Sequence, residues 1–269
     1  MKKIICFHLL NDYSGSPKIL NLILKGLCMK GYEINLVTSR NAGILDELNS
    51  CKHIKIYRYR YLFSNNPLLT ILRYLYVQLY TFFFSFRYIF HKDVIFYINT
   101  LLPIGPALAG RLMGKKVVFH YHENAFAKGL FYRVLAFMMQ WLANDIVCVS
   151  NFQRNNLKKK EYATVIPNSL SADYEERCRA CYVERDYKTV LMLSSLKLYK
   201  GILEFVQLSE RLPQYHFLLV INDVQKNIDK FCTMYNILYH ENLEIWDRQS
   251  DVFPFYERAS LVLNLSNKK

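Results

Sequence analysis

Residues 190–201 decide the fold, and they read V-L-M-L-S-S-L-K-L-Y-K-G. The apolar run 190–193 has the length of a buried strand, and Ser194 and Ser195 interrupt it. From Gly201 onward the apolar residues recur at the spacing of a helix. The segment therefore predicts a strand, a polar turn and a helix, which places the turn at the carboxyl edge of a parallel sheet, where ligands bind.

Lys200 is the unusual residue of this segment, because a cation in the first turn of a helix opposes the helix dipole. The conflict disappears if an anionic phosphate lies on the helix N-terminus and pairs with the lysine ammonium. A solvated lysine at a helix start fits the same pattern, so both interpretations stay open at this point.

The rest of the chain alternates strands and helices in the same way. Strands are predicted at 3–10, 33–38, 54–61, 93–99, 116–122, 145–150, 164–166, 189–193, 215–220, 243–246 and 261–265. Their nearly continuous apolar runs are typical of parallel sheets that helices cover on both faces. The composition turns polar and charged between the seventh and eighth strands. We therefore predict an α/β chain of two Rossmann-like, doubly wound domains, 1–168 and 187–269, joined by a linker or hinge at 169–186.

The first predicted helix begins at a turn, where Ser16 is the expected N-cap and Pro17 the first helical residue.

The second predicted domain is short compared with the usual domain size of about 100–150 residues. The sequence ends just after a strand that we expect to be buried, before any covering helix. We therefore expect this domain to be incomplete at its C-terminus.

The net charge and the cysteine content of the chain indicate which kinds of partner it could bind. The formal charge of +13 favours an anionic partner, which could be nucleic acid, anionic lipid or a phosphorylated metabolite. The basic residues are spread along the chain without a nucleic-acid-binding signature, so we expect no nucleic acid partner. The seven scattered cysteines suggest reduced thiols. Cys178 and Cys181 form a lone C-x-x-C, so no metal or redox site is expected there.

Seven segments, in order, resemble those of the family 4 glycosyltransferases, which have the GT-B fold, and especially those of bacterial surface-polysaccharide synthesis. The segments are S-G-S-P-K-I-L (14–20), N-T-L-L-P-I-G (99–105), H-Y-H-E (120–123), D-I-V-C-V-S (145–150), V-I-P-N-S-L (165–170), S-S-L-K-L-Y-K-G (194–201) and D-V-F-P-F-Y-E-R-A-S-L-V-L-N-L-S (251–266). Each motif alone is weak, but the ordered series covers essentially the whole chain.

The resemblance implies a retaining transferase that moves a sugar from a nucleotide-sugar donor, a UDP- or GDP-sugar, to an acceptor in a cleft between two domains. No cofactor and no essential metal are expected. The reaction of such transferases needs cations and N–H groups that stabilise the departing diphosphate. By this resemblance Lys200 would pair with the donor diphosphate, and the backbone of Gly15 and Ser16 would approach the phosphates. His122 would face the reacting sugar, with Glu123 as a weaker catalytic candidate.

His120, two residues before His122, is expected to be structural.

The sequence departs from the family pattern in two places. The family commonly has Gly-Arg where Ser194 and Ser195 stand, so Lys197 is the candidate to replace the missing cation. The family's E-x7-E region, which holds the donor's sugar and ribose, would follow Ser266, but the sequence ends at Lys269 before any such region. The alternative function is therefore a non-catalytic, truncated remnant that binds acceptor glycan or a partner enzyme.

The aromatic segment 67–90 predicts a long helix with Arg73 and Arg87 among its Tyr and Phe residues. Its charge-free part, 74–86, is shorter than a membrane span. Such a helix fits an anionic membrane surface, where a lipid-linked glycan acceptor would be used, and it equally fits a buried helix of the first domain. The expected products are lipopolysaccharide, O-antigen or capsule, and the expected location is the cytoplasm or the inner face of the cytoplasmic membrane.

Overall fold

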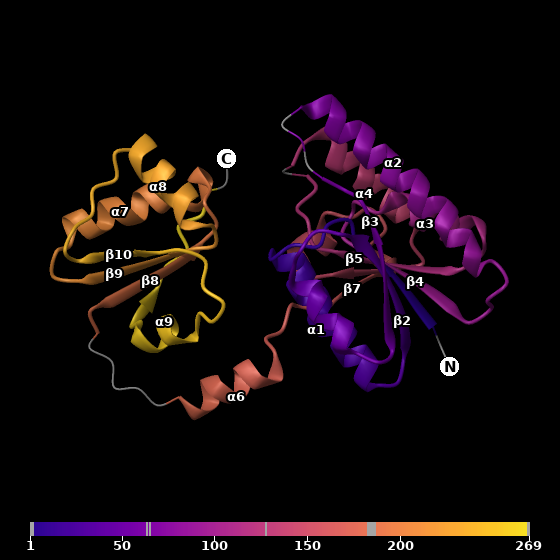
Figure 1. The fold of residues 1–269 in the computed structure, drawn as a ribbon, viewed down its shortest axis with the longest axis horizontal. Coiled ribbons are helices and arrows are strands. Elements are labelled where there is room, and N and C mark those ends of the chain that lie inside the picture. Colours follow the sequence, from indigo (N-terminus) through magenta and orange to yellow (C-terminus); the bar gives the residue numbers. More distant parts are fainter. Residues whose placement is uncertain (1–2, 63, 65, 127, 182–186, 268–269) are drawn as a thin grey trace. The chain divides into compact units, whose positions relative to one another are not determined.

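The computed structural model describes residues 3–62, 64, 66–126, 128–181 and 187–267. They form two compact units, Met1–Ser171 and Ala172–Lys269. The first unit is built on a seven-stranded sheet and the second on a four-stranded sheet (Figure 1). Every strand pair in both sheets is parallel.

The sheet of the first unit has the strand order β3-β2-β1-β4-β5-β6-β7. The strands are β1 (Lys3–Phe7), β2 (Glu33–Ser39), β3 (Ile54–Tyr59), β4 (Val94–Asn99), β5 (Lys116–Tyr121), β6 (Asp145–Cys148) and β7 (Ala163–Val165). The chain winds in one direction from β1 to β3 and in the other from β4 to β7. The switch point therefore lies between β1 and β4, where an open parallel sheet leaves a crevice at the carboxyl ends of its strands.

Helices cover both faces of this sheet (Figure 1). The helical segments are α1 (Gly15–Met29), η1 (Ile44–Ser50), α2 (Pro67–Ser85), η2 (Phe86–Tyr88), α3 (Ile104–Leu112), α4 (Leu130–Leu142), α5 (Asn151–Asn155) and η3 (Lys160–Tyr162). Ile4 and Cys6 pack in one core with residues of α1 and η1, whereas Ile5 and Phe7 pack in another with residues of α2, α3 and α4. Successive strand residues point to opposite faces of the sheet, and helices cover both faces. The residues on either side of a strand such as β1 must therefore be apolar.

The second unit has the strand order β10-β9-β8-β11. Its elements are α6 (Ala172–Ala180), β8 (Thr189–Ser194), η4 (Leu198–Lys200), α7 (Ile202–Arg211), β9 (His216–Ile221), α8 (Gln225–Met234), β10 (Leu243–Trp246), α9 (Phe253–Arg258) and β11 (Leu261–Val262). Residues of α7 and α8 pack on one face of the sheet, and residues of α9 on the other. The predicted α/β, GT-B type architecture of two parallel-sheet domains, the second of them smaller, is confirmed.

The segment predicted as a linker, 169–186, contains α6, which packs within the second unit. Arg177 forms an ion pair with Asp251 at 2.9 Å, and its guanidinium lies 4.2 Å from the centre of the Phe253 ring. The Tyr174 and Phe253 rings meet edge to face, with centroids 5.5 Å apart. Residues 182–186 of the predicted linker lie outside the described residues.

Two local predictions were wrong. Helix α1 begins at Gly15, so Ser16 lies inside its first turn, where Pro17 is tolerated because its missing N–H has no helical partner. The last strand is not buried: Leu261 is 52% exposed and Val262 is 49% exposed. This strand lies at the edge of the sheet, so only one of its sides meets another strand.

Candidate active site

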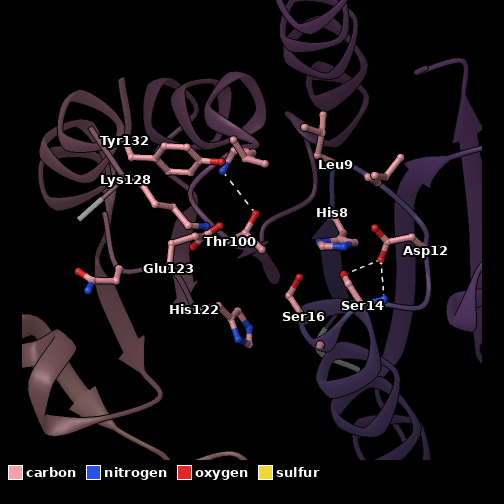
Figure 2. Close-up of a pocket in the computed structure, with 14 residues that line it drawn as sticks. His8, Leu9, Asp12, Ser14, Ser16, Thr100, His122, Glu123, Lys128 and Tyr132 are labelled. Atoms are coloured by element: carbon pink, nitrogen blue, oxygen red, sulfur yellow. Dashed lines mark hydrogen bonds between the residues drawn. The ribbon is translucent and has the colours of Figure 1, made fainter. Parts of the chain in front are cut away.

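A pocket of about 420 Å³ lies at the switch point of the seven-stranded sheet (Figure 2). The residues that line it are His8, Leu9, Leu10, Asp12, Ser14, Gly15, Ser16, Thr100, Leu102, His122, Glu123, Asn124, Lys128 and Tyr132. They come from the segments that follow β1, β4 and β5 at the carboxyl edge. Four predicted site residues, Gly15, Ser16, His122 and Glu123, therefore lie in one pocket although they are far apart in sequence.

Asn99, the last residue of β4, connects two histidines at this edge. Its Oδ1 lies 3.0 Å from His122 Nε2, and its Nδ2 lies 3.0 Å from His8 Nδ1. Asn99 Nδ2 also donates to the Ser16 carbonyl at 3.5 Å, which sets the orientation of the amide. With this orientation Nε2 of His122 carries the proton, and Nδ1 is left as an acceptor.

Burial keeps these histidines neutral. It lowers the pKa of His8 to about 4, and the pKa of His120 to about 4. The pKa of His122 falls to about 3, through burial first and then through the neighbouring His120 and His8. His120 is 3% exposed, and its Nδ1 is hydrogen-bonded to the Tyr97 hydroxyl at 2.8 Å. Its ring centroid lies 4.0 Å from that of His122, with the two ring planes tilted by 44°. His122 therefore offers a neutral imidazole to the pocket at neutral pH.

Glu123 holds the turn that follows β4. Both of its carboxylate oxygens accept from the Leu101 N–H at 3.3 Å. Burial raises the pKa of this carboxyl, against the lowering effect of the Leu101 N–H. Thr100, just before Leu101, has a φ of 73°, a left-handed conformation that is uncommon for a β-branched residue. Strained backbone of this kind is frequent at functional sites.

The N-terminus of α1 opens into the pocket. A Cβ built on Gly15 meets no atom of the described chain within 4 Å, so there is free space beside this glycine. Asp12 Oδ1 accepts from the Ser14 N–H at 2.8 Å and from the Ser14 hydroxyl at 2.6 Å, which shapes the loop before the helix (Figure 2). The helix dipole favours an anion at the Gly15 and Ser16 N–H groups, while the nearby Asp12 carboxylate opposes one on its own side.

Known proteins share the fold of this chain. Residues 13–174 match the family described as Glycosyltransferase Family 4. The chain belongs to glycosyltransferase family 4. It is a transferase with the GT-B architecture. No curated protein sequence matches it.

Solved structures show the fold of this family 4 glycosyltransferase. HepE from Anabaena, solved in complex with UDP and glucose, has a TM-score of 0.68 and 16% identity over 98% of this chain and 74% of HepE. A glycosyltransferase from Rickettsia africae has a TM-score of 0.66 and 18% identity over 98% and 73% of the two chains. Sucrose-phosphate synthase from Thermosynechococcus elongatus has a TM-score of 0.67 and 12% identity over 100% and 77%.

The remaining predicted site residues of the glycosyltransferase lie in the second unit, in the turn after β8. Lys197 Nζ lies 5.9 Å and Lys200 Nζ 5.5 Å from the centre of the Tyr199 ring. The Ser195 carbonyl accepts from the Lys197 N–H at 2.7 Å. Lys200 is not in the first turn of the helix, as predicted, but in the short 3-10 turn η4 before it. The chain turns between the two segments at Gly201, whose φ of 80° few other residues adopt.

Sequence reasoning missed His8, Asn99, Thr100, Lys128 and Tyr132. Only a pairing of β1, β4 and β5 brings them together, and the motif spacing does not encode that pairing. The signal that could have found Asn99 is its position at the end of a buried strand, within the N-T-L-L-P-I-G segment. Within the described ranges, no three His, Cys, Asp or Glu side chains are grouped closely enough to hold a metal ion.

Proposed function

We propose that this protein transfers a sugar, with retention of the anomeric configuration, from a UDP- or GDP-sugar to a lipid-linked glycan. The product would enter a bacterial surface polysaccharide such as lipopolysaccharide, O-antigen or capsule. The reaction would take place at the inner face of the cytoplasmic membrane, without a resident cofactor or metal. The family match supports the reaction class, and HepE, solved with UDP and glucose, supports the class of donor.

The observation that carries the proposal is the neutral imidazole of His122. Its Nε2–H is engaged by Asn99 at 3.0 Å, so its Nδ1 can accept a hydrogen bond from a sugar hydroxyl. A pKa of about 3 makes His122 a poor general acid at neutral pH, so its proposed role is to orient the sugar. Because Glu123 is engaged by the Leu101 N–H, its proposed part is to hold the strained turn beside the sugar.

The donor's phosphates need positive partners. In the first unit, the N–H groups of Gly15 and Ser16 at the start of α1 are proposed to bind them. In the second unit, Lys200, Lys197 and the Ser195 backbone are proposed to bind the diphosphate.

In the proposed reaction the bond between C1 of the donor sugar and the diphosphate oxygen breaks, and its electron pair leaves with the diphosphate. A new C1–O bond forms to the acceptor hydroxyl, whose proton passes to the leaving phosphate oxygen.

The first experiment is a transfer assay with radiolabelled UDP- and GDP-sugars and a bacterial lipid extract as acceptor source. We expect His122→Ala to lower kcat/KM at least 100-fold, because the sugar loses an orienting contact. His53→Ala changes an exposed histidine of the same unit, outside the pocket, and should stay within twofold of the unchanged protein.

Equal activity of His122→Ala and His53→Ala would refute the role of this pocket in the reaction. A protein that turns over none of the donors, yet binds the glycan of the extract with His122-dependent affinity, would support the alternative, a non-catalytic protein that binds acceptor glycan.

A further inference from the structure

The fully buried residues of helix α2 are small, whereas most of its large apolar residues are exposed. Its buried residues are Val77, Thr81 and Ser85, and the last two donate their hydroxyls to carbonyls of the helix itself at 2.7 Å. Large apolar side chains on its outer side are 50–68% exposed: Leu68, Ile71, Leu72, Leu75, Tyr76, Leu79 and Phe83. A soluble helix normally has the opposite distribution. A continuous exposed apolar face of this kind marks an interaction site.

Helix α4 extends this face. It covers the same side of the sheet as α2 (Figure 1) and exposes residues at helical spacing along its outer side. These residues are 48–78% exposed: Leu130, Phe131, Val134, Phe137 and Trp141. The rings of Tyr74 on α2 and Phe131 on α4 are 5.7 Å apart, so the two helices are in contact. We call the exposed apolar residues of α2 and α4 together the apolar surface.

The two segments that carry the apolar surface have charges of one sign, although the exposed Asp93 follows the first of them. Segments 48–92 and 124–144 contain no Asp and no Glu. They do contain exposed cations, including Arg60, Arg87, Lys92 and Arg133. Three further exposed lysines, 158–160, follow in a segment that is tied to α4, because the N–H groups of Lys158 and Lys159 donate to Gln140 Oε1. An apolar face with a cationic edge complements an anionic phospholipid surface.

We infer that α2 and α4 dock the first unit on an anionic phospholipid bilayer, with the apolar surface inserted at the level of the headgroups. A second copy of the chain is a poorer occupant, because a two-fold interface would bring the cations of segments 48–92 and 124–144 against one another, and these segments contain no carboxylate to pair them. Trp141 and Tyr76, both exposed on this surface, are residue types that favour the membrane interface.

The helix lies on the membrane rather than crossing it. By length and mean hydropathy the segment Pro67–Tyr88 could span a bilayer, since its 22 residues extend about 33 Å, so the length limit inferred from the sequence was too strict. Its inner side, however, is fastened to α3: Gln78 Oε1 accepts from the Gly105 N–H at 2.9 Å. Crossing would break these contacts and leave Gly105 N–H and Gln78 without partners in hydrocarbon.

The apolar surface adjoins the pocket. Tyr74 donates its hydroxyl to the carbonyl of Leu102, a pocket residue, at 2.8 Å. The rings of Phe131, on the surface, and Tyr132, in the pocket, are 5.7 Å apart. An acceptor anchored in the bilayer by a lipid would therefore present its glycan near His122; this last step rests on the proposed function, whereas membrane docking does not.

The test is flotation of the full-length protein with vesicles of phosphatidylcholine alone and of phosphatidylcholine with 30% phosphatidylglycerol. We expect at least tenfold more protein on the anionic vesicles. Leu79→Glu/Phe137→Glu places one carboxylate on each helix of the surface and should lower that binding at least tenfold. Met29→Glu/Met234→Glu is the matched control at two exposed apolar positions of α1 and α8, and should bind within twofold of the unchanged protein.

Equal binding of the two double variants, or no binding of the unchanged protein to anionic vesicles, would overturn the inference. So would a dimer in solution that only Leu79→Glu/Phe137→Glu dissociates, since the surface would then belong to a second copy. Flotation needs no turnover. Binding to vesicles by a protein that transfers no sugar would therefore refute the proposed function and leave the docking surface standing.

Discussion

Asn99 sets the protonation of the two histidines that it bridges. Its side chain is completely buried, and it offers one acceptor to His122 and one donor to His8. Because a neutral imidazole has one donor and one acceptor nitrogen, this arrangement selects a single tautomer for each ring. We therefore propose that Asn99 is a positioning residue, which would act on a sugar only through His122.

Asn99→Asp should reverse this control. A carboxylate between two imidazoles favours their protonated forms, so at least one of them should bind a proton more tightly. We expect the pKa of His122 or His8, about 3 and about 4 in the unchanged protein, to rise by at least about 2 units, measured by NMR of the ring protons. Transfer at neutral pH should fall about 10- to 100-fold, in the usual range for loss of a positioning contact.

The exposed Asn49 provides the control, since Asn49→Asp makes the same chemical change outside the pocket. Unchanged histidine titrations in Asn99→Asp would show that Asn99 does not determine the protonation of the rings.

At the scale of the element, the close packing of α2 against α3 holds the apolar surface in place. A Cβ on Gly105 would collide with the backbone carbonyl of Gln78, so α3 can approach this closely only through a glycine. Small residues at a helix contact allow such an approach, as in membrane proteins. The contact of α2 with α3 therefore depends on the absence of a side chain at Gly105, whereas the outer side of α2 carries large exposed apolar residues.

Gly105→Ala should separate the two helices. Because the added methyl would meet backbone rather than a flexible side chain, we expect the free energy of unfolding to fall by about 2 kcal/mol or more. Urea unfolding followed by circular dichroism measures this. Gly26→Ala is the control in α1, where a Cβ meets no described atom within 4 Å, and it should stabilise by about 0.5–1 kcal/mol. A Gly105→Ala protein as stable as the unchanged one would show that the helices can move apart without loss.

At the scale of the whole molecule, the buried histidines make the stability of the first unit depend on pH. The pKa values of His8, His120 and His122 are about 4, 4 and 3 in the folded chain, and near 6.5 when it is unfolded. Between these values the unfolded chain binds protons that the folded chain does not. The free energy of unfolding therefore falls as the pH falls below 6.5.

We expect a loss of about 2 kcal/mol per buried histidine between pH 6.5 and 5, reduced where the three rings interact. Glu123 has the opposite effect on the free energy of unfolding. Because its pKa is raised, the folded chain binds this proton at a higher pH than the unfolded chain does. Opening free energies from amide hydrogen exchange of β4 and β5 measure the effect in the first unit. Amides of β9 in the second unit are the internal comparison, because the pKa of Glu244 there, lowered to about 2, affects stability only below about pH 4.5.

Equal opening free energies of β4 and β5 at pH 7.5 and 5 would contradict this account. A decrease of the same size in β9 would also contradict it, by assigning the effect to something other than the pocket histidines.

The sequence by itself determined the architecture and the family. Apolar runs such as 190–193 must be buried on both faces, and a chain that alternates such runs with amphipathic helices has few packed solutions other than a parallel sheet. The ordered motifs from 14–20 to 251–266 then pointed to a GT-B glycosyltransferase, which the family match over residues 13–174 confirms. The roles of individual site residues, and the domain boundaries, stay predictions.

Only the tertiary structure decided which side chains meet. His8, Asn99 and His122 are more than 90 positions apart at their extremes, and they meet because β1, β4 and β5 are neighbours in the sheet. Tertiary contacts likewise decided that α2 exposes its apolar side, since its composition fits a buried helix equally well. Local propensities act over a few residues, whereas strand order and helix facing depend on contacts between distant segments, which no short stretch of the sequence encodes.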